Sequence, residues 1–264
     1  MLSDDVFPWF HPSTIIVLSV VTVLIFVLWL LLPSSQNKQK NSKRKQKEHA
    51  VITGGSSGIG LALAHECVKQ GFRNVTLIAR DETKLQAAKK ELMERVVDGT
   101  TGIHTYSFDV SNGTACQEYA TAIINNAGPP TVLFNNAGTS SSAAFHETPL
   151  DEFSRLMAVN YLGAVYLTQA LLPSMKQNHG GTICMTSSMA GLVGVYGYTA
   201  YSASKFALKG YCEALQMEVR RDGVNVMLAF PPDTDTPGYK LENESKPKET
   251  VAISEVAGLF PPET

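Results

Sequence analysis

The hydrophobic pattern of the chain alternates between short apolar runs and longer amphipathic stretches. Six runs have the length and composition of strands: Ala50–Thr53, Val75–Arg80, Ile103–Val110, Thr131–Gly138, Gly181–Ser188 and Val224–Phe230. Helical patterns lie between them, for example at Ile59–Gln70, Leu85–Val96 and Tyr201–Val219. The strand runs are almost continuously apolar, as expected when helices cover both faces of a sheet. The pattern therefore predicts an α/β fold of the Rossmann type, with a doubly wound parallel sheet.

A different apolar run stands near the N-terminus. Ile15–Leu32 is interrupted only by Ser19 and Thr22, and about 20 apolar residues are enough to span a bilayer. A cleaved signal peptide is the alternative, but the segment before the run is acidic and no small-residue cleavage site follows it. We therefore expect a retained transmembrane anchor at residues 14–32, after a short segment at 1–13.

Basic residues follow this run directly. Six of the ten residues from Lys38 to Lys47 are Lys or Arg. The positive-inside rule predicts that this basic linker, residues 33–48, and the globular domain, residues 49–264, face the cytosol while residues 1–13 are lumenal. A nuclear localisation signal has the same composition, but beside a membrane span, attraction to anionic lipid headgroups is the favoured interpretation.

The composition of the chain limits its domain number, its partners and its cysteine chemistry. A chain of 264 residues with 44% hydrophobic residues suits one large domain plus the N-terminal segment. The formal net charge of −2 indicates no general attraction to nucleic acid. Four cysteines, Cys67, Cys116, Cys184 and Cys212, are widely separated and form no C-x-x-C pair, so we expect reduced thiols and neither a disulfide framework nor a metal site.

A glycine-rich loop at Thr53–Gly60 (TGGSSGIG) follows the first strand run and opens the first helical pattern. Gly54, Gly58 and Gly60 permit a tight turn, close approach of the backbone to a phosphate, and close packing of helix on strand. The helix N-terminus favours an anion. The loop, with Ser56 and Ser57 inside it, therefore predicts a dinucleotide site.

The last residue of the second strand run bears on which dinucleotide is bound. A carboxylate there accepts the ribose hydroxyls of NAD, whereas Arg80 suits the 2′-phosphate of NADPH. Lys84 adds positive charge one turn later, while Asp81 between them weakens the inference. A solvated Arg at a strand end is the alternative. The prediction is NADPH.

Tyr201 and Lys205 are four residues apart in a helical pattern and so share one helix face. An ammonium beside a phenol favours the phenolate, lowers the tyrosine pKa from about 10, and makes the hydroxyl a usable acid and base. Ser188, thirteen residues before Tyr201, could add a hydrogen bond to a substrate oxygen. Alone, the Tyr-x-x-x-Lys pattern is weak, because it also occurs by chance on amphipathic helices.

Other motifs strengthen this interpretation. Phe134–Gly138 (FNNAG), Val159–Gly163 (VNYLG) and Phe230–Gly238 (FPPDTDTPG) occur with the glycine loop and the Tyr/Lys pair in a characteristic order. From about Glu48 onward the chain resembles the short-chain dehydrogenase/reductase family.

The resemblance implies a catalytic group. Tyr201 is then the general acid, and Lys205 lowers its pKa and holds the nicotinamide ribose. Ser188 bonds the reacting oxygen, with Ser187 as the alternative, and Asn160 anchors a water that leads protons toward Lys205.

It also implies further cofactor contacts. Asp109 and Val110 meet the adenine, and Thr234 and Thr236 lie over the nicotinamide and phosphates. The NNAG pattern occurs twice, and the copy with Asn136 is preferred because it follows an apolar strand, whereas Asn125–Gly128 ends a helical run.

Pro231 and Pro232 stand where most relatives carry Pro-Gly, and this run resembles members that reduce keto-sphingoid bases. The resemblance implies an NADPH-dependent reductase of a long-chain keto-sphingoid base, anchored in the endoplasmic reticulum membrane and able to form a homodimer through the helix of Tyr201. A reductase of steroids, retinoids or other lipid carbonyls, and a non-catalytic cofactor-binding protein, are the alternatives. From Gly238 we expect a mobile substrate loop. We also expect the last helix and strand of the family fold to be missing, which leaves an open sheet edge.

Overall fold

The computed structural model describes residues 48–96, 99 and 101–263. The predicted lumenal segment and transmembrane anchor lie outside these residues, as does the basic linker except Glu48.

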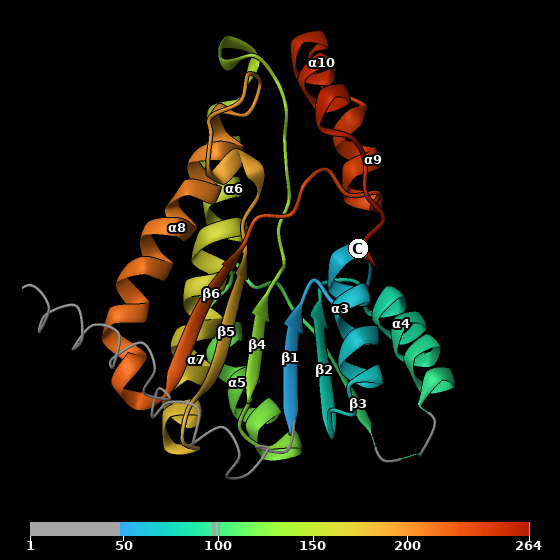
Figure 1. Ribbon diagram of the computed structural model, residues 1–264, viewed down its shortest axis with the longest axis vertical. Helices are drawn as coiled ribbons and strands as arrows, with labels where there is room; N and C mark the ends of the chain where they lie inside the picture. The colour runs from blue at the N-terminus through green and yellow to red at the C-terminus, as the bar shows by residue number, and fades with distance from the viewer. Residues whose placement is uncertain (1–47, 97–98, 100, 264) are drawn as a thin grey trace, which may run out of the picture. The chain divides into compact units, whose positions relative to one another are not determined.

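Six strands form one parallel sheet in the order β3-β2-β1-β4-β5-β6 (Figure 1). Their bounds are β1 His49–Thr53, β2 Asn74–Ala79, β3 Gly102–Ser107, β4 Val132–Asn135, β5 Gly181–Thr186 and β6 Val224–Ala229. Each lies within or beside one of the predicted apolar runs, so the predicted doubly wound parallel sheet is confirmed. The strand order reverses between β1 and β4, and the crevice at such a point is the usual ligand site of open α/β sheets.

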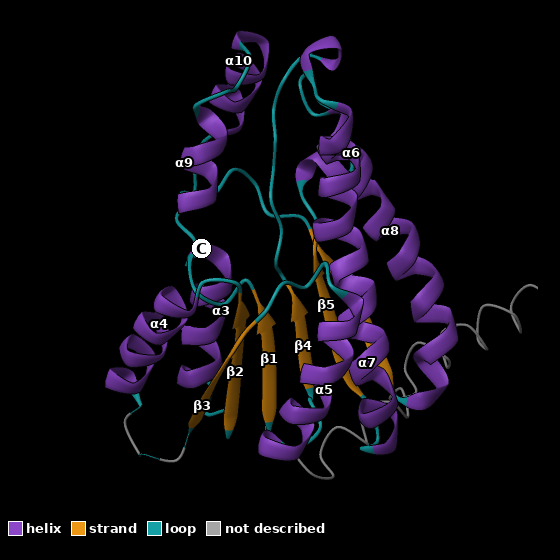
Figure 2. Ribbon diagram, turned by 180° about the vertical axis from the view of Figure 1, so that it is seen from behind, coloured by secondary structure: helices purple, strands orange, loops and turns teal. Residues whose placement is uncertain are grey.

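Helices cover both faces of this sheet. Their bounds are α3 Gly58–Lys69, α4 Glu82–Arg95, α5 Gly113–Ala127, α6 Leu150–Leu156, α7 Gly163–Gln177, α8 Thr199–Val219, α9 Pro237–Asn243 and α10 Lys248–Ala257. Helices α3 and α4 cover the face turned to the viewer in Figure 1, and α5 and α7 cover the opposite face, seen in Figure 2. The described residues thus form the three layers that the alternating pattern predicts.

Two hydrophobic cores lie on the two faces. One joins β1 and β2 to α3 and α4 through fully buried side chains such as Leu77 and Leu85. The other joins β4 and β5 to α5, α7 and α8, with Leu167, Leu171 and Ile183 fully buried. Burial of each such side chain contributes about 1.5–3 kcal/mol, and this fixes the helices against the strands that carry the site.

The helix ends follow the sequence signals. Gly71 and Gly223 lie just past the ends of α3 and α8 and have φ angles of 73° and 74°. This left-handed conformation is open to glycine at little cost, so a glycine is favoured just past each helix end.

A single helical stretch, Leu150–Gln177, contains α6, a π-helical segment at Met157–Leu162, and α7. Among the described residues it is the one helix long and apolar enough to cross a membrane by length and composition. Its side chains Leu167, Leu171 and Met175 are fully buried in the core, so the apolar composition reflects packing on the sheet.

The segment after β6 differs from the sequence-based prediction. The expected loop from Gly238 is wrong, because this segment forms α9 and α10, which extend beyond the carboxyl ends of the strands (Figure 1). The Thr236 side chain accepts a hydrogen bond from the backbone N–H of Tyr239 (3.1 Å), and Pro237 occupies the first helical turn. A threonine cap followed by proline is a helix start signal, which the prediction overlooked. We call residues 233–260 the cap.

Candidate active site

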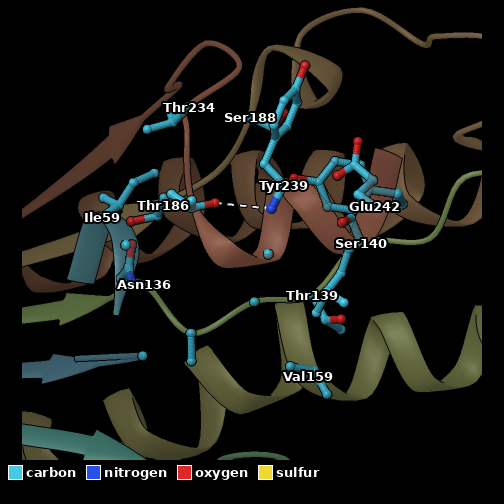
Figure 3. A pocket seen from close by; sticks show the side chains of 18 of the residues that line it. Ile59, Asn136, Thr139, Ser140, Val159, Thr186, Ser188, Thr234, Tyr239 and Glu242 are labelled. Carbon is cyan, nitrogen blue, oxygen red and sulfur yellow. Dashed lines mark hydrogen bonds between the residues drawn. The ribbon is translucent and has the colours of Figure 1, made fainter. Parts of the chain in front are cut away.

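A cavity of about 660 Å³ lies at the carboxyl ends of the strands, between the sheet and the cap. Figure 3 shows Ile59, Asn136 and Thr234 on one side of it and Ser140 and Glu242 on the other. Most of the predicted site residues line this cavity: Gly54, Ser56, Ser57, Gly58, Arg80, Lys84, Asp109, Val110, Asn136, Ser187, Ser188, Tyr201, Lys205, Thr234 and Thr236. Gly60 and Asn160 are not part of the lining.

The glycine loop is built for close backbone packing. Gly54 and Gly58 have φ angles of 67° and 55°, a region that favours glycine. A Cβ on Gly60 would lie 2.2 Å from the carbonyl oxygen of Gly54, and one on Gly58 would lie 2.9 Å from Cγ2 of Thr236. The loop therefore has no room for side chains where α3 begins, and its backbone is free to approach a phosphate at the helix N-terminus.

Thr53, at the end of β1, ties this loop to the second NNAG segment. Its hydroxyl oxygen accepts the backbone N–H groups of Asn136 (2.9 Å) and Ala137 (2.8 Å). The Asn136 amide donates back to the Thr53 carbonyl (3.2 Å). Asn125–Gly128, the first copy, closes α5 instead and does not line the cavity. The second copy is therefore the one beside the glycine loop.

Positive charge lies at the end of β2. The Arg80 side chain is 74% exposed and its guanidinium is 3.9 Å from the Asp109 carboxylate. Asp81 is the N-cap of α4, because its carboxylate accepts the backbone N–H of Lys84 (3.0 Å). The acidic residue that weakened the sequence argument is thus engaged in capping, a role that its position before an amphipathic run could have indicated.

Tyr201 and Lys205 share one face of α8. The Lys205 Nζ lies 5.7 Å from the centroid of the Tyr201 ring and donates to the Thr186 carbonyl (2.9 Å). Lys205 is 4% exposed, and burial lowers its pKa to about 8. Burial disfavours the ammonium because the protein interior solvates charge poorly.

The expected lowering of the Tyr201 pKa by Lys205 is wrong. Burial raises this pKa; the hydrogen bond with Ser188 opposes the rise, and the charges of Glu242 and Asp233 add to it. The Lys205 ammonium is directed at the Thr186 carbonyl and so does not offset the cost of burying a phenolate. In this state Tyr201 is a protonated phenol, the form that donates a proton.

The two adjacent serines have different partners. The Ser187 hydroxyl is buried and donates to the Lys205 carbonyl of α8 (3.1 Å). Ser188 accepts the backbone N–H of Ala190 (3.2 Å) and bonds the Tyr201 hydroxyl. Ser188 is therefore the serine beside the Tyr201 hydroxyl, while Ser187 links the end of β5 to α8.

Asn160 lies in the π-helical segment, a distortion often found at functional sites. Its amide accepts the Thr139 N–H (2.8 Å) and donates to the Ser204 hydroxyl (2.9 Å). A Cβ on Gly138 would lie 3.3 Å from both the Asn160 Oδ1 and the Lys205 Nζ, so these two groups flank the same glycine. A proton path from Asn160 to Lys205 stays a prediction.

The cavity lining includes residues that the sequence reasoning missed, and three of them, Tyr198, Asp233 and Glu242, carry polar groups close to Tyr201. The Tyr198 hydroxyl donates to the Glu242 carboxylate, and its ring centroid is 5.4 Å from that of Tyr201. Tyr198 stands three residues before Tyr201 and could have been predicted to share its side of the helix. The local sequence could not predict that Glu242 lies in the cavity, because its position depends on how the cap packs against the rest of the fold.

The fold and the site define a class of dinucleotide-dependent oxidoreductases. The family model described as short chain dehydrogenase matches residues 48–247, so the chain belongs to the short-chain dehydrogenase family. The predicted family membership is confirmed.

Two individual relatives show which members of the family this chain is similar to. The 3-dehydrosphinganine reductase of Danio rerio is 43% identical over 253 residues, which cover 94% of this chain and 74% of that protein. The 3-ketodihydrosphingosine reductase of Bos taurus is 47% identical over 221 residues, covering 81% of this chain and 65% of that protein. The chain therefore spans about two thirds to three quarters of the length of these relatives.

A solved structure has the same fold. An alcohol dehydrogenase from Thermococcus sibiricus, complexed with 5-hydroxy-NADP, is 25% identical with a TM-score of 0.70. The match covers 82% of this chain and 86% of that one.

Proposed function

We propose that this protein reduces the ketone of a long-chain keto-sphingoid base, 3-ketodihydrosphingosine, with NADPH to give sphinganine. The observation that carries the proposal is the meeting of Tyr201, Ser188 and Lys205 in one cavity with the glycine loop. The names of the relatives from Danio rerio and Bos taurus support the substrate. Exposed apolar side chains among the cavity residues, Met189, Leu241 and Ile253, suit an alkyl chain.

The residues fit a nicotinamide dinucleotide. The glycine loop is packed so closely that a Cβ at Gly60 would clash with the Gly54 carbonyl, and the loop opens a helix whose N-terminus attracts phosphate. Bound NADPH supplies the hydride. Asp109 and Val110 line the part of the cavity assigned to the adenine, and Thr234 and Thr236 the part assigned to the nicotinamide and phosphates.

In the proposed reaction Tyr201 donates its phenolic proton to the ketone oxygen. Ser188 holds the same oxygen by a hydrogen bond and stabilises the phenolate that forms. Lys205, whose ammonium donates to the Thr186 carbonyl beside Tyr201, holds the nicotinamide ribose in this proposal. General acid catalysis of this kind contributes about 10² to 10⁴ in rate.

We further propose that residues 14–32 anchor the protein in the endoplasmic reticulum membrane, with residues 49–264 in the cytosol. The apolar run Ile15–Leu32 and the basic residues after it support this arrangement. An amphiphilic substrate is concentrated at a bilayer, and the anchor would hold the catalytic domain close to it. Retention of the protein in the membrane pellet after alkaline carbonate extraction tests the anchor. Pairing of two chains through α8 is proposed by family resemblance alone.

A comparison of substrates tests the proposed function. The purified full chain with NADPH is assayed on 3-ketodihydrosphingosine and on a steroid ketone. We expect turnover of the sphingoid base and a kcat/KM for the steroid lower by about a hundredfold, because one missing polar recognition group costs about 2–3 kcal/mol. Preference for the steroid would favour the alternative lipid reductase, and absence of any turnover with intact NADPH binding would favour a non-catalytic cofactor-binding protein.

The NADPH assignment predicts a selective effect of Arg80→Leu. Loss of a guanidinium that bonds the 2′-phosphate should raise the Kd for NADPH about ten- to a hundredfold, since hydrogen bonds to charged groups contribute about 1.5–3 kcal/mol. The Kd for NADH should change little. Arg221→Leu, at an exposed turn outside the cavity, is the matched control. Equal weakening of both cofactors on titration would contradict the role of Arg80.

A further inference from the structure

The cap brings two carboxylates to the reactive side of Tyr201. Asp233 and Glu242 both line the cavity that Tyr201 and Ser188 line. Glu242 is joined to Tyr201 through Tyr198, whose hydroxyl bonds the carboxylate and whose ring packs at 5.4 Å from the Tyr201 ring. These acidic groups therefore belong to the same cavity as the proton donor.

The position of the carboxylates is held by the fold of the cap. The backbone N–H of Phe260 donates to the Asp233 carbonyl (2.9 Å), and the Asp235 N–H donates to the Phe260 carbonyl (2.8 Å). The buried Thr250 hydroxyl of α10 donates to the Tyr196 carbonyl (2.9 Å), just before α8. The two ends of the cap are thus bonded to each other, and α10 is attached to the segment before α8.

The corner of the cavity formed by Asp233 and Glu242 holds more carboxylates than cations. The Lys246 ammonium, 1% exposed, lies 3.0 Å from the Glu242 carboxylate and packs over the ring of Tyr239. Asp233 accepts a hydrogen bond from the Tyr239 hydroxyl (3.2 Å) but makes no ion pair with any residue of the described part of the chain. Among the described residues, one cation is thus paired with one of the two carboxylates, and the half-buried Asp233 carboxylate has no cationic partner, so a ligand of opposite charge is favoured there.

A keto-sphingoid base carries a cation in a matching position. Its ammonium is on the carbon next to the ketone carbon, so a ketone held by Tyr201 and Ser188 brings the ammonium into the same corner of the cavity. We propose, as a deepening of the proposed function on which it rests, that Asp233, with Glu242 beside it, binds the ammonium group of the substrate. The subsite selects ketones with a neighbouring amine over neutral lipid ketones.

The subsite also bears on the proton transfer. Both carboxylates raise the pKa of Tyr201 and so oppose loss of its proton. An ammonium held between them and the phenol offsets that negative potential. An amino ketone therefore acquires both a binding contact and an easier proton transfer, whereas a neutral ketone acquires neither.

Asp233→Asn is the sharpest test, because the amide keeps the size of the side chain and can still accept the Tyr239 hydroxyl. The full chain with NADPH is assayed on 3-ketodihydrosphingosine and on its analogue that has hydrogen in place of the ammonium. We expect kcat/KM for the amino ketone to fall about ten- to a hundredfold, the range of a charge-assisted hydrogen bond, and that for the analogue to stay equal or rise.

Asp235→Asn is the matched control. Asp235 is two residues away, outside the cavity lining, and pairs with Lys240 at 3.1 Å, so both substrates should be turned over as by the wild type. Glu242→Gln is the second variant, with the same selective loss expected. Equal losses for both substrates in Asp233→Asn, or no loss for the amino ketone, would overturn the subsite.

A binding measurement separates this inference from the proposed function. Titration calorimetry of the wild-type protein with NADP⁺ compares sphinganine with the alcohol that lacks its amine. Absence of turnover with both ketones would refute the proposed function, yet weaker sphinganine binding by Asp233→Asn would still support the subsite. Equal affinity of the wild type for the two alcohols would overturn the subsite even if the reductase activity is found.

Discussion

Replacement of Tyr201 by Phe is expected to reduce kcat for the keto-sphingoid base about 10² to 10⁴-fold, because the proton donor to the ketone oxygen is removed. The ring and its packing against Tyr198 are kept, so the free energy of unfolding and the Kd for NADPH should change little. The measurement is steady-state NADPH oxidation with substrate, beside cofactor titration of the same sample.

Tyr196→Phe is the matched control for Tyr201→Phe. Tyr196 is exposed, precedes α8 and does not line the cavity, so its hydroxyl should be dispensable. If Tyr201→Phe keeps more than about a tenth of the wild-type rate, another group donates the proton and the assignment of the general acid is wrong.

The second large effect is expected for Gly60→Ala. The added Cβ would meet the Gly54 carbonyl oxygen at 2.2 Å and its carbonyl carbon at 2.7 Å, both backbone atoms that a rotamer change cannot move. The glycine loop must shift, at a cost of about 1–3 kcal/mol typical of overpacking. We expect a lower thermal midpoint and an NADPH Kd raised by about tenfold or more, as 1.4 kcal/mol is a factor of ten.

Gly210→Ala serves as the control for this change. Gly210 lies in α8 and is exposed, and a Cβ added there would meet no atom within 4 Å outside its own helical turn. Alanine there should raise the free energy of unfolding by about 0.5–1 kcal/mol, since glycine is unfavourable inside a helix. Thermal denaturation with and without NADPH compares both variants, and unchanged cofactor affinity in Gly60→Ala would show that the close packing is unnecessary.

Much of the cofactor side could be predicted from local sequence. The glycine loop stands between an apolar run and a helical pattern, and Arg80 ends the next strand run, so the order of elements brings both to one edge of a parallel sheet. The Tyr201 and Lys205 pair follows from helix periodicity alone. The strand pattern predicts a parallel sheet, and the carboxyl ends of its strands meet at one edge. The glycine loop, Arg80 and the Tyr201–Lys205 pair are therefore expected to line one cavity.

The proton affinity of Tyr201 could not be predicted in this way. Sequence spacing indicates that Lys205 is near, but not that its ammonium is directed to the Thr186 carbonyl. Nor does it reveal that Asp233 and Glu242 face the phenol from the cap. The sign of a pKa shift depends on burial and on the sum of all nearby charges, and these are set by distant segments.

By itself, the amino-acid sequence determined the parallel α/β sheet, the glycine loop, the Tyr201–Lys205 face and membership of the family, because each depends on local periodicity and short motifs. Only the tertiary structure decided that Ser188 and not Ser187 meets Tyr201, that the segment after Gly238 is helical, and that Asp233 and Glu242 of the cap line the cavity. These features depend on packing between segments far apart in the chain, and no local pattern encodes the direction of a side chain across such a contact.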